Sequence, residues 1–518
     1  MASTVHGLIE RQAAARPDAV YALSADASQT ITFGTLRDDC RTLGAALTGR
    51  GLRPGDTLSF VMPNGLQTLR LLLGAMHAGF CVNPVNLLSQ ADAMRYVLEH
   101  SDCRLVVAAP EWADRVRALL AAIDRAIDLV VLEPDGDAAA MRAAFATTAQ
   151  AEAETDAPAN GVSPTPGAPA DDAIALLMYT SGTTGVPKGV MLTQSNLAAN
   201  AAAISIEHEL GESDRVLGVL PLYHINAFAV TMLAPLAHGG SVVMEPRFSA
   251  AQFWSQVGAR RCTWINVVPT IISYLLEGET PASAGLAGIR FCRSASAALP
   301  PEHHRAFEAK FGIGIIETMG LTETVAPAFS NPLAPDRRKI GSVGRASGGE
   351  ARVIDAELLP VPDGTTGEIA IRGPQVMRGY YKNEAATNAS FAPDGWLRTG
   401  DLGHRDADGF FFITGRIKEL IIKGGENIAP REIDDVLLGH PAVREAAAVG
   451  IPDRHYGQEI MACVVLRHGT ACTAEELRDF CLERLGRYKV PKVIRFVTSL
   501  PRGPSGKVQR LKLLDGGA

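Results

Sequence analysis

Short apolar runs alternate with amphipathic stretches along the first part of the chain. Residues 57–62 and 105–108 are mainly apolar and are bounded by Gly, Pro or charged residues, which is typical of strands buried on both faces. Residues 67–78 and 111–123 follow these runs with apolar positions at helical spacing. Because strands and helices take turns in this way, the pattern predicts an α/β domain.

The alternation resumes after position 190 and gives way to a different pattern beyond Gly341. Helices are predicted at residues 195–206 and 251–260, and strands at residues 215–220 and 263–268. Beyond Gly341 the apolar runs are short and separated by Pro, Gly and Asp. We therefore expect a β-rich subdomain with strands at residues 350–354, 367–372 and 409–414.

The residues after Arg416 have the pattern of a separate, smaller α+β unit. At 518 residues the chain also exceeds the length that one hydrophobic core usually serves. We therefore predict a large N-terminal domain at residues 1–417 and a small C-terminal domain at residues 418–518. In the small domain we expect strands at residues 420–422, 443–449, 462–466 and 493–496, and helices at residues 430–438 and 474–484.

Residues 133–172 differ in composition from the rest of the chain. This segment is rich in Ala, Pro, Thr, Asp and Glu and has few aliphatic side chains other than Ala. Such a composition buries little apolar surface. We expect an exposed, flexible insertion without a chemical role.

The overall composition is that of an ordinary globular protein, with 47% hydrophobic and 20% charged residues. A formal net charge of −7 gives no broad electrostatic reason to bind nucleic acid or an anionic membrane. No apolar run approaches the roughly 20 residues that span a bilayer, and residues 1–20 lack the apolar core of a signal peptide. The eight cysteines are scattered, which favours buried thiols over disulfides or zinc ligands. We expect a cytoplasmic protein without nucleic-acid or membrane partners.

Residues 179–189 read Tyr-Thr-Ser-Gly-Thr-Thr-Gly-Val-Pro-Lys-Gly and carry the strongest chemical signal in the chain. Glycines and hydroxyl side chains let a loop wrap N–H and O–H donors around a polyphosphate. A Walker loop has Gly-Lys-Ser/Thr in immediate succession, whereas two residues separate Gly185 from Lys188 here. The pattern predicts a phosphate loop of another kind, and the alternative is a glycine-rich surface turn with a solvated lysine.

Four further motifs follow in order: Glu-Thr-Met-Gly-Leu-Thr-Glu at 317–323, Trp-Leu-Arg-Thr-Gly-Asp at 396–401, Gly-Arg-Ile-Lys-Glu-Leu at 415–420 and Pro-Ser-Gly-Lys at 504–507. With the phosphate loop, they resemble the signatures of the adenylate-forming superfamily. That superfamily comprises acyl-CoA synthetases, luciferases and the adenylation domains of peptide synthetases. The similarity covers nearly the whole chain.

The resemblance implies an AMP-forming ligase that uses ATP, Mg²⁺ and coenzyme A. A carboxylate is a poor electrophile because hydroxide is a bad leaving group. An acyl-adenylate provides AMP as the leaving group and releases pyrophosphate. The protein must therefore hold ATP in line with the carboxylate and offset the negative charge at the α-phosphate.

The resemblance also assigns roles in ATP binding. Thr322 would donate its hydroxyl to the α-phosphate, and Glu323 would hold Mg²⁺, a cation that prefers oxygen ligands. Taken alone, Glu323 would be better explained as a solvated carboxylate at a helix start. The candidates for the β- and γ-phosphates are Thr180, Ser181, Gly182, Thr183, Thr184 and Lys188.

Three more residues complete the predicted nucleotide site. Asp401 is suited to accept both ribose hydroxyls, because a carboxylate has two acceptor oxygens; the alternative is an Asx turn after Gly400. Arg416 would contact the ribose or a phosphate. By resemblance, Lys507 would bridge the acid and the α-phosphate during adenylation, although a lysine near a C-terminus is usually just solvated.

The superfamily carries out two half-reactions by rotating its small domain. Lys418 matches the hinge residue, so residues 418–518 are expected to be mobile as a unit. Lys423, Gly424 and Gly425 would then form the loop that enters for the thioester step with coenzyme A. An ordinary turn between a strand and a helix remains the alternative for this loop.

The acyl pocket is predicted from two segments and one substitution. His224 and Asn226 lie in a motif that walls this pocket in the superfamily, and the stretch at 291–299 resembles the oxalyl-CoA synthetase branch. Ser294 and Ser296, with His224 and Asn226, would hydrogen-bond a polar or anionic head. Met319 stands where relatives usually have an aromatic residue, which leaves the pocket shape open. Arg293 either adds positive charge or pairs with a structural carboxylate.

The leading interpretation is a ligase for a small polar or dianionic carboxylic acid such as oxalate, malonate or sulfoacetate. Alternatives within the same chemistry are a ligase for medium-chain fatty or aromatic acids, or transfer of the acyl group to a carrier-protein thiol. No carrier domain follows Ala518, which favours free coenzyme A as the acceptor. A non-catalytic nucleotide-binding sensor is the alternative from another class.

Overall fold

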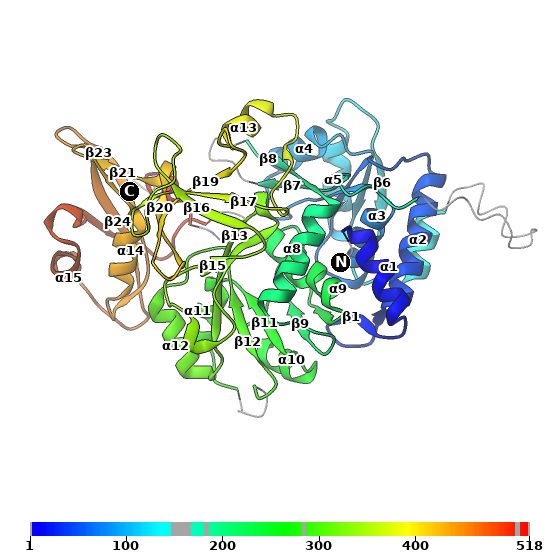
Figure 1. The fold of residues 1–518 in the computed structure, drawn as a ribbon, viewed down its shortest axis with the longest axis horizontal. Coiled ribbons are helices and arrows are strands. Elements are labelled where there is room, and N and C mark those ends of the chain that lie inside the picture. The colour runs from blue at the N-terminus through cyan, green and yellow to red at the C-terminus, as the bar shows by residue number, and fades with distance from the viewer. Residues whose placement is uncertain (1–2, 147–166, 181–185, 282–285, 503–507, 516–518) are drawn as a thin grey trace, which may run out of the picture.

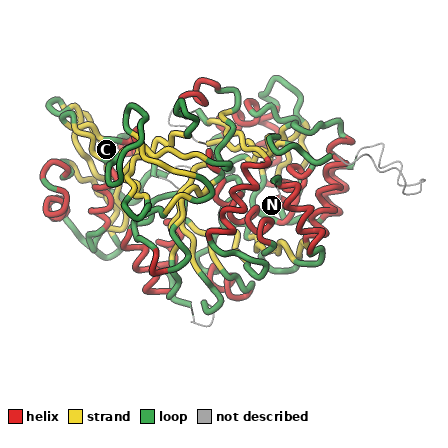
Figure 2. Tube along the Cα trace, in the orientation of Figure 1, coloured by secondary structure: helices red, strands yellow, loops and turns green. Residues whose placement is uncertain are grey.

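The computed structural model describes residues 3–146, 167–180, 186–281, 286–502 and 508–515. Two large sheets, a smaller sheet and their helices form the N-terminal domain, and a further sheet with its own helices forms a smaller C-terminal domain (Figure 1). Helices and strands are interleaved throughout the N-terminal domain (Figure 2). The α/β class predicted from the sequence is confirmed.

The first large sheet has seven strands in the order β18-β8-β7-β4-β3-β5-β6. The strands from β7 to β6 are parallel to their neighbours, whereas β8 and β18 add antiparallel pairs at one edge. The bounds are β3 (Thr57–Val61), β4 (Cys81–Pro84), β5 (Leu105–Ala108), β6 (Asp128–Val131), β7 (Ile174–Thr180), β8 (Lys188–Thr193) and β18 (Gly379–Tyr380).

The second large sheet has nine strands in the order β15-β14-β13-β12-β11-β9-β10-β1-β2. The strands from β13 to β1 are parallel, so their carboxyl ends share one edge, where α/β sheets usually bind ligands. The bounds are β1 (Val20–Ser24), β2 (Thr30–Thr32), β9 (Arg215–Gly218), β10 (Ser241–Met244), β11 (Trp264–Val267), β12 (Phe291–Ser294), β13 (Ile315–Leu321), β14 (Ala326–Ser330) and β15 (Arg345–Ala346).

One continuous core joins strands of both large sheets with side chains of α1, α2, α3 and α8. α3 is buried on every side, and α8 begins at Thr193, whose hydroxyl accepts the N–H of Asn196 in a capping box. The helix bounds are α1 (Val5–Ala15), α2 (Phe33–Gly49), α3 (Leu66–His77), α4 (Ala91–His100), α5 (Pro110–Leu120), α6 (Ala138–Phe145), α8 (Gln194–Glu207), η1 (Ala227–Leu233), α9 (Ala234–His238), α10 (Phe253–Ala259), α11 (Pro269–Glu277), α12 (Pro301–Phe311), η3 (Thr322–Thr324), η4 (Pro335–Arg337) and α13 (Glu384–Ala389).

The segment predicted to be a flexible insertion is partly helical. α6 begins after Asp137, whose carboxylate accepts the N–H of Ala140, and it buries Met141 and Phe145. These two side chains are four residues apart and share one helix face, which the alanine-rich composition concealed. The prediction is therefore wrong for this helix, and residues 147–166 lie outside the described part of the chain.

A four-stranded antiparallel sheet, in the order β16-β17-β19-β20, completes the N-terminal domain. It packs on β14 through a cluster that includes Phe329, Ile369 and Phe411. The strand bounds are β16 (Glu350–Ile354), β17 (Gly367–Arg372), β19 (Leu397–Arg405) and β20 (Phe411–Arg416).

The C-terminal sheet has the order β22-β21-β24-β23, with β25 beside β24. It has two core clusters of its own, and neither contains a described residue that precedes Ile421. The bounds are η5 (Ile417–Glu419), β21 (Ile421–Lys423), β22 (Glu426–Ile428), α14 (Pro430–Leu438), β23 (Val443–Asp453), β24 (Gly457–Leu466), α15 (Ala474–Leu485), η6 (Arg487–Lys489), β25 (Val493–Phe496) and η7 (Arg510–Leu513).

No helix in the described ranges is long and apolar enough to cross a membrane.

Candidate active site

A cavity of about 600 Å³ lies where the two domains meet. Ser296 follows β12 and Met319 lies on β13, so the carboxyl ends of neighbouring parallel strands form one wall. Asp401 and Arg416 line it from the four-stranded sheet, and Arg502 lines it from the C-terminal domain. Residues from the motifs at 317–323, 396–401 and 415–420 and from the stretch at 291–299 therefore line this cavity.

The predicted phosphate loop connects two antiparallel strands. Thr180 at the end of β7 is paired with Lys188 at the start of β8, so the segment between them begins and ends on two adjacent antiparallel strands. This topology differs from a Walker loop, which joins a strand to a helix. Ser181, Gly182, Thr183 and Thr184 lie outside the described residues.

Tyr380 connects the phosphate-loop lysine to the predicted metal ligand. The Lys188 ammonium lies 4.7 Å from the centre of the Tyr380 ring, a cation–π distance. The Tyr380 hydroxyl donates a hydrogen bond of 2.8 Å to Glu323, and burial together with that carboxylate raises the pKa of Tyr380. Sequence reasoning missed Tyr380, although the Gly-Tyr-Tyr run at 379–381 was a usable signal.

Glu323 and its neighbour Thr322 begin the short turn η3 after β13. The turn is fixed because the N–H of Met377 donates to the carbonyl of Glu323. A carboxylate that is held by a tyrosine hydroxyl, whose ring also contacts Lys188, fits a Mg²⁺–phosphate complex, since that cation prefers oxygen ligands.

Asp401 and Arg416 face each other across β19 and β20. They are paired in register, and the Arg416 Nε donates a hydrogen bond of 2.7 Å to the Asp401 carboxylate. Asp401 is 2% exposed. The carboxylates of Asp401 and, more weakly, of Glu419 and Glu323 raise the pKa of Arg416. Asp401 and Arg416, both predicted to contact the nucleotide, thus form an ion pair at the cavity wall.

Lys507 lies outside the described residues, but both ends of its loop are placed. Arg502 and Val508 form an antiparallel bridge, and both line the cavity with Asp401 and Arg416. Arg502 is also held by Glu445 at 2.5 Å. The loop that carries Lys507 therefore starts and ends at the cavity.

The structure brings three of the predicted pocket residues together and adds a fourth. Arg293 donates hydrogen bonds of 2.7 Å to Asn226 and to Asn266, and Asn226 donates one of 3.2 Å to Ser296. Burial lowers the pKa of Arg293 to about 9. Asn266 was missed because one polar residue inside the apolar run of β11 gives no functional signal in the sequence.

Two other residues predicted for the pocket, Ser294 and His224, lie in different surroundings. Ser294 is fully buried on β12 and makes no side-chain hydrogen bond within the described chain. His224 lies in the turn after β9, where its ring packs edge-on against Tyr223 at 4.8 Å. Asn64 fixes this turn by bonding the backbone of Leu220 and Leu222.

Glu317 lines the cavity and was quoted in a motif without being given a role. It is 2% exposed, and one carboxylate oxygen accepts the N–H of Leu299 at 3.3 Å. Burial raises the pKa of Glu317 to about 7, and the nearby Arg431 opposes this shift. Arg431 belongs to α14, so this carboxyl group faces a charge from the other domain.

The predicted hinge and coenzyme A loop lie beyond the cavity. Lys418 is exposed in η5, the short link between β20 and β21. Gly424 and Gly425 form the β21–β22 turn with φ of 57° and 90°, conformations that favour glycine. Lys423 is 6% exposed and its ammonium lies 2.6 Å from Glu459. In this conformation Lys423 holds the loop instead of facing solvent.

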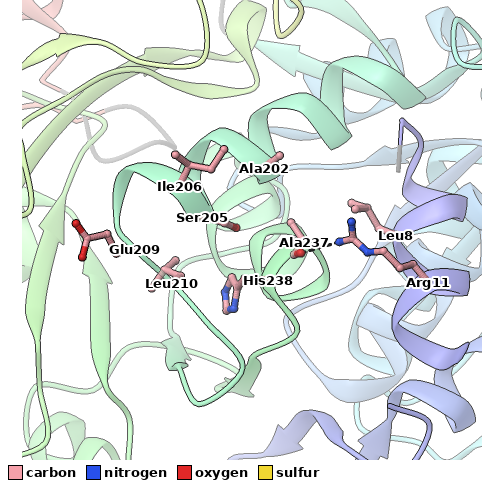
Figure 3. A pocket seen from close by; sticks show the side chains of 9 residues that line it. All are labelled: Leu8, Arg11, Ala202, Ser205, Ile206, Glu209, Leu210, Ala237 and His238. Atoms are coloured by element: carbon pink, nitrogen blue, oxygen red, sulfur yellow. Dashed lines mark hydrogen bonds between the residues drawn. The ribbon is translucent and has the colours of Figure 1, made fainter. Parts of the chain in front are cut away.

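A second cavity, of about 350 Å³, lies between α1, α8 and α9 (Figure 3). Arg11 points across it and donates to the carbonyl of Ala237 at 2.7 Å. Among the residues that the structure describes, none of those predicted to act on ATP or the acid lines this cavity.

Comparisons with known proteins identify the family of this chain. The AMP-binding enzyme family matches residues 9–381, and the AMP-binding enzyme C-terminal domain matches residues 432–507. The chain is 58% identical to a sulfoacetate–CoA ligase of Cupriavidus necator, with 99% of this chain and 97% of the relative covered. It is 35% identical to an oxalate–CoA ligase of Arabidopsis thaliana, with 98% and 97% covered.

Solved structures show the same architecture. The ATP-bound crystal structure of MatB from Rhodopseudomonas palustris superposes with a TM-score of 0.88 at 30% identity, covering 99% of this chain and 98% of that one. The likeness in sequence and in fold extends over both domains. The chain therefore belongs to the AMP-binding enzyme family, within the superfamily of adenylate-forming CoA ligases.

Proposed function

We propose that this ligase activates a short dianionic acid of the sulfoacetate type with ATP and transfers the acyl group to coenzyme A. One observation carries the proposal: the cavity that Asp401 and Arg416 line also contains Ser296, behind which lies the buried cation Arg293. The relatives named for sulfoacetate and oxalate, at 58% and 35% identity, support the same substrate class.

In the first half-reaction the acid's carboxylate attacks the α-phosphate, and pyrophosphate leaves. Asp401 would accept hydrogen bonds from the ribose hydroxyls, and it would also keep the Arg416 side chain in its orientation. Lys188 and Thr180, with Ser181, Gly182, Thr183 and Thr184, would bind the outer phosphates. Glu323 would hold Mg²⁺, which offsets phosphate charge when bound, and Thr322 would donate to the α-phosphate.

Lys507 would neutralise charge where the acid and the α-phosphate meet, because a fixed cation stabilises the charge that gathers there in the transition state. In the second half-reaction the thiol of coenzyme A attacks the acyl carbon, and AMP leaves. Rotation about Lys418 would move the Lys507 loop out of the active site and bring Gly424 and Gly425 into it. The ion pair between Lys423 and Glu459 would stabilise the loop that carries these glycines. A few hinge dihedrals can absorb such a motion.

A ligase for medium-chain or aromatic acids fits this pocket less well. Arg293, Asn226 and Ser296 are polar, and an apolar acyl chain would leave these polar groups without compensation. Met319 and His224 would complete the walls around a short acid.

We expect sulfoacetate to support ATP–pyrophosphate exchange and to give a CoA thioester, with oxalate or malonate used less well. The measurement is exchange over a panel of acids, followed by detection of the thioester by mass spectrometry. Hexanoate and benzoate serve as controls for the apolar alternatives. Strong exchange with either control and none with the dianions would refute the proposed substrate class.

Replacing Tyr380 by phenylalanine is expected to raise the Mg²⁺ concentration needed for half-maximal exchange several-fold. The substitution keeps the ring beneath Lys188 and removes only the hydroxyl that holds Glu323; a hydrogen bond to a charged group contributes about 1.5–3 kcal/mol. The measurement is exchange against Mg²⁺ concentration. Tyr381→Phe is the matched control, because its hydroxyl bonds Asp102 instead. An unchanged Mg²⁺ dependence in Tyr380→Phe would remove Tyr380 from this role.

A further inference from the structure

Arg293 is a fully buried cation that has no carboxylate partner among the described residues. Its side chain is 1% exposed, and burial alone accounts for its lowered pKa. Within the described ranges Arg293 forms no ion pair, and no nearby carboxylate affects its pKa. A buried charge is costly unless it is paired, so this position needs an anion that the described chain does not provide.

Two amide side chains hold the guanidinium in one orientation. Asn266 and Arg293 are register partners on the parallel strands β11 and β12, so their side chains lie on the same face of the sheet. The Oδ1 atoms of Asn266 and Asn226 each accept from Arg293 Nη1 at 2.7 Å. The Arg293 Nε is buried and has no hydrogen-bond partner in the described part of the chain. Carbonyl oxygens orient the cation, but they carry no formal charge that could neutralise it.

This cluster is directed toward the active-site cavity through Asn226. Because Asn226 Oδ1 faces Arg293, its Nδ2 points the other way and donates to Ser296 Oγ at 3.2 Å. Ser296 lines the cavity. It also has a φ of 75°, a left-handed conformation that costs a non-glycine residue about 1 kcal/mol or more and that is common at binding sites. Asn226 thus links the buried Arg293 to Ser296, which stands at the cavity wall.

We propose that Arg293, Asn226, Asn266 and Ser296 form the subsite for the second anionic group of the acid, the sulfonate or carboxylate that does not react. Ser296 is the donor that meets this group, and the Asn226 amide lies directly behind it. Arg293 and Asn266 are positioning residues, which fix the Asn226 amide and supply the charge behind it. The inference rests on the proposed function and adds to it the residues that distinguish a dianion from a monoanion.

The chemistry of the subsite explains why such selection is strong. An acid with an uncharged end would occupy the cavity and leave the buried guanidinium without compensation. A site built to hydrogen-bond a substrate group rejects analogues that lack this group far better than an apolar pocket rejects a small change in size. The second charge of the acid therefore determines which acids bind well. The reacting carboxylate is bound elsewhere in the cavity, next to the ATP.

The test compares sulfoacetate with 3,3-dimethylbutanoate, in which three methyl groups replace the three sulfonate oxygens and remove the charge. The variant is Asn266→Asp, which puts a permanent carboxylate beside Arg293 with almost no change in shape. We expect its KM for sulfoacetate to rise at least about tenfold, equivalent to about 1.4 kcal/mol. The KM for ATP and the exchange rate with 3,3-dimethylbutanoate should stay within about twofold of the wild type.

Asn266→Ala is the matched comparison, because it removes the same amide without adding charge. Since Asn266 is a positioning residue, this variant should also lose preference for sulfoacetate, but less than Asn266→Asp, and its thermal midpoint should fall below that of Asn266→Asp, which compensates the buried cation. Asn226→Ala gives a second line of evidence that does not depend on Asn266. It leaves Arg293 bonded to Asn266 and should show the same loss of preference as Asn266→Asp.

Three outcomes would overturn the inference. The first is an unchanged preference between the two acids in both Asn266→Asp and Asn226→Ala. The second is an equal loss with both acids, which indicates general damage and no recognition of charge. The third is a wild-type enzyme that uses neither sulfoacetate nor another dianion; in that case the proposed function fails, and the subsite fails with it.

Discussion

Replacing Lys507 by alanine is expected to slow acyl-adenylate formation by about 100-fold or more, while transfer from a supplied acyl-adenylate to coenzyme A stays within about threefold. The expected loss corresponds to removal of one fixed charge-stabilising donor from a transition state. The asymmetry follows because the lysine is assigned to the first half-reaction only. Arg502 and Val508, which flank its loop, line the cavity with Asp401.

The two half-reactions are measured separately. ATP–pyrophosphate exchange reports adenylation, and thioester formation from synthetic acyl-adenylate reports transfer. Lys512→Ala is the matched control, since this exposed lysine lies in the same C-terminal segment and outside the cavity lining. Equal losses in both steps would contradict the role assigned to Lys507.

Replacing Asp401 by alanine is expected to lower kcat/KM for ATP by about 100-fold or more. Each hydrogen bond from a ribose hydroxyl to a carboxylate contributes about 1.5–3 kcal/mol, and two such bonds are assigned to Asp401. The substitution also removes the partner that orients Arg416 at 2.7 Å. A cation that has lost its buried partner binds less well, because its own orientation is no longer fixed.

The specific readout is discrimination between ATP and 2′-deoxy-ATP. The wild type should prefer ATP, and Asp401→Ala should use both nucleotides almost equally, because the hydroxyl that distinguishes them has lost its acceptor. Asp408→Ala is the control: this acid lies in the β19–β20 turn and pairs with Lys339 at 2.7 Å. If Asp401→Ala kept the full preference for ATP, the ribose would have to be bound elsewhere.

Local structure was predictable wherever an element's own residues decide it. The strand at residues 105–108 and the helix at residues 430–438 match β5 and α14 in full, because a short apolar run and a Pro-initiated amphipathic pattern are each specific. The helix α6 was missed because two apolar side chains within an alanine-rich stretch resemble a linker.

The residues proposed to bind the nucleotide could be singled out from the sequence because they stand in compact motifs. Asp401 and Arg416 lie in two such motifs, and the structure pairs them across adjacent strands. The surroundings of Lys423 could not be predicted from its motif. Its motif indicated a loop that faces coenzyme A, but the ammonium is buried against Glu459, 36 positions further along the chain, at 2.6 Å.

The sequence by itself determined most of the order of strands and helices and the motifs of the AMP-binding enzyme family, because these depend on residues that are close along the chain. Only the tertiary structure decided which distant polar groups meet. Tyr380 reaches Glu323 across 57 positions, and Arg293 reaches Asn226 across 67. Such contacts are made by the packing of whole elements. The free-energy cost of a buried charge depends on the partners that this packing places beside it.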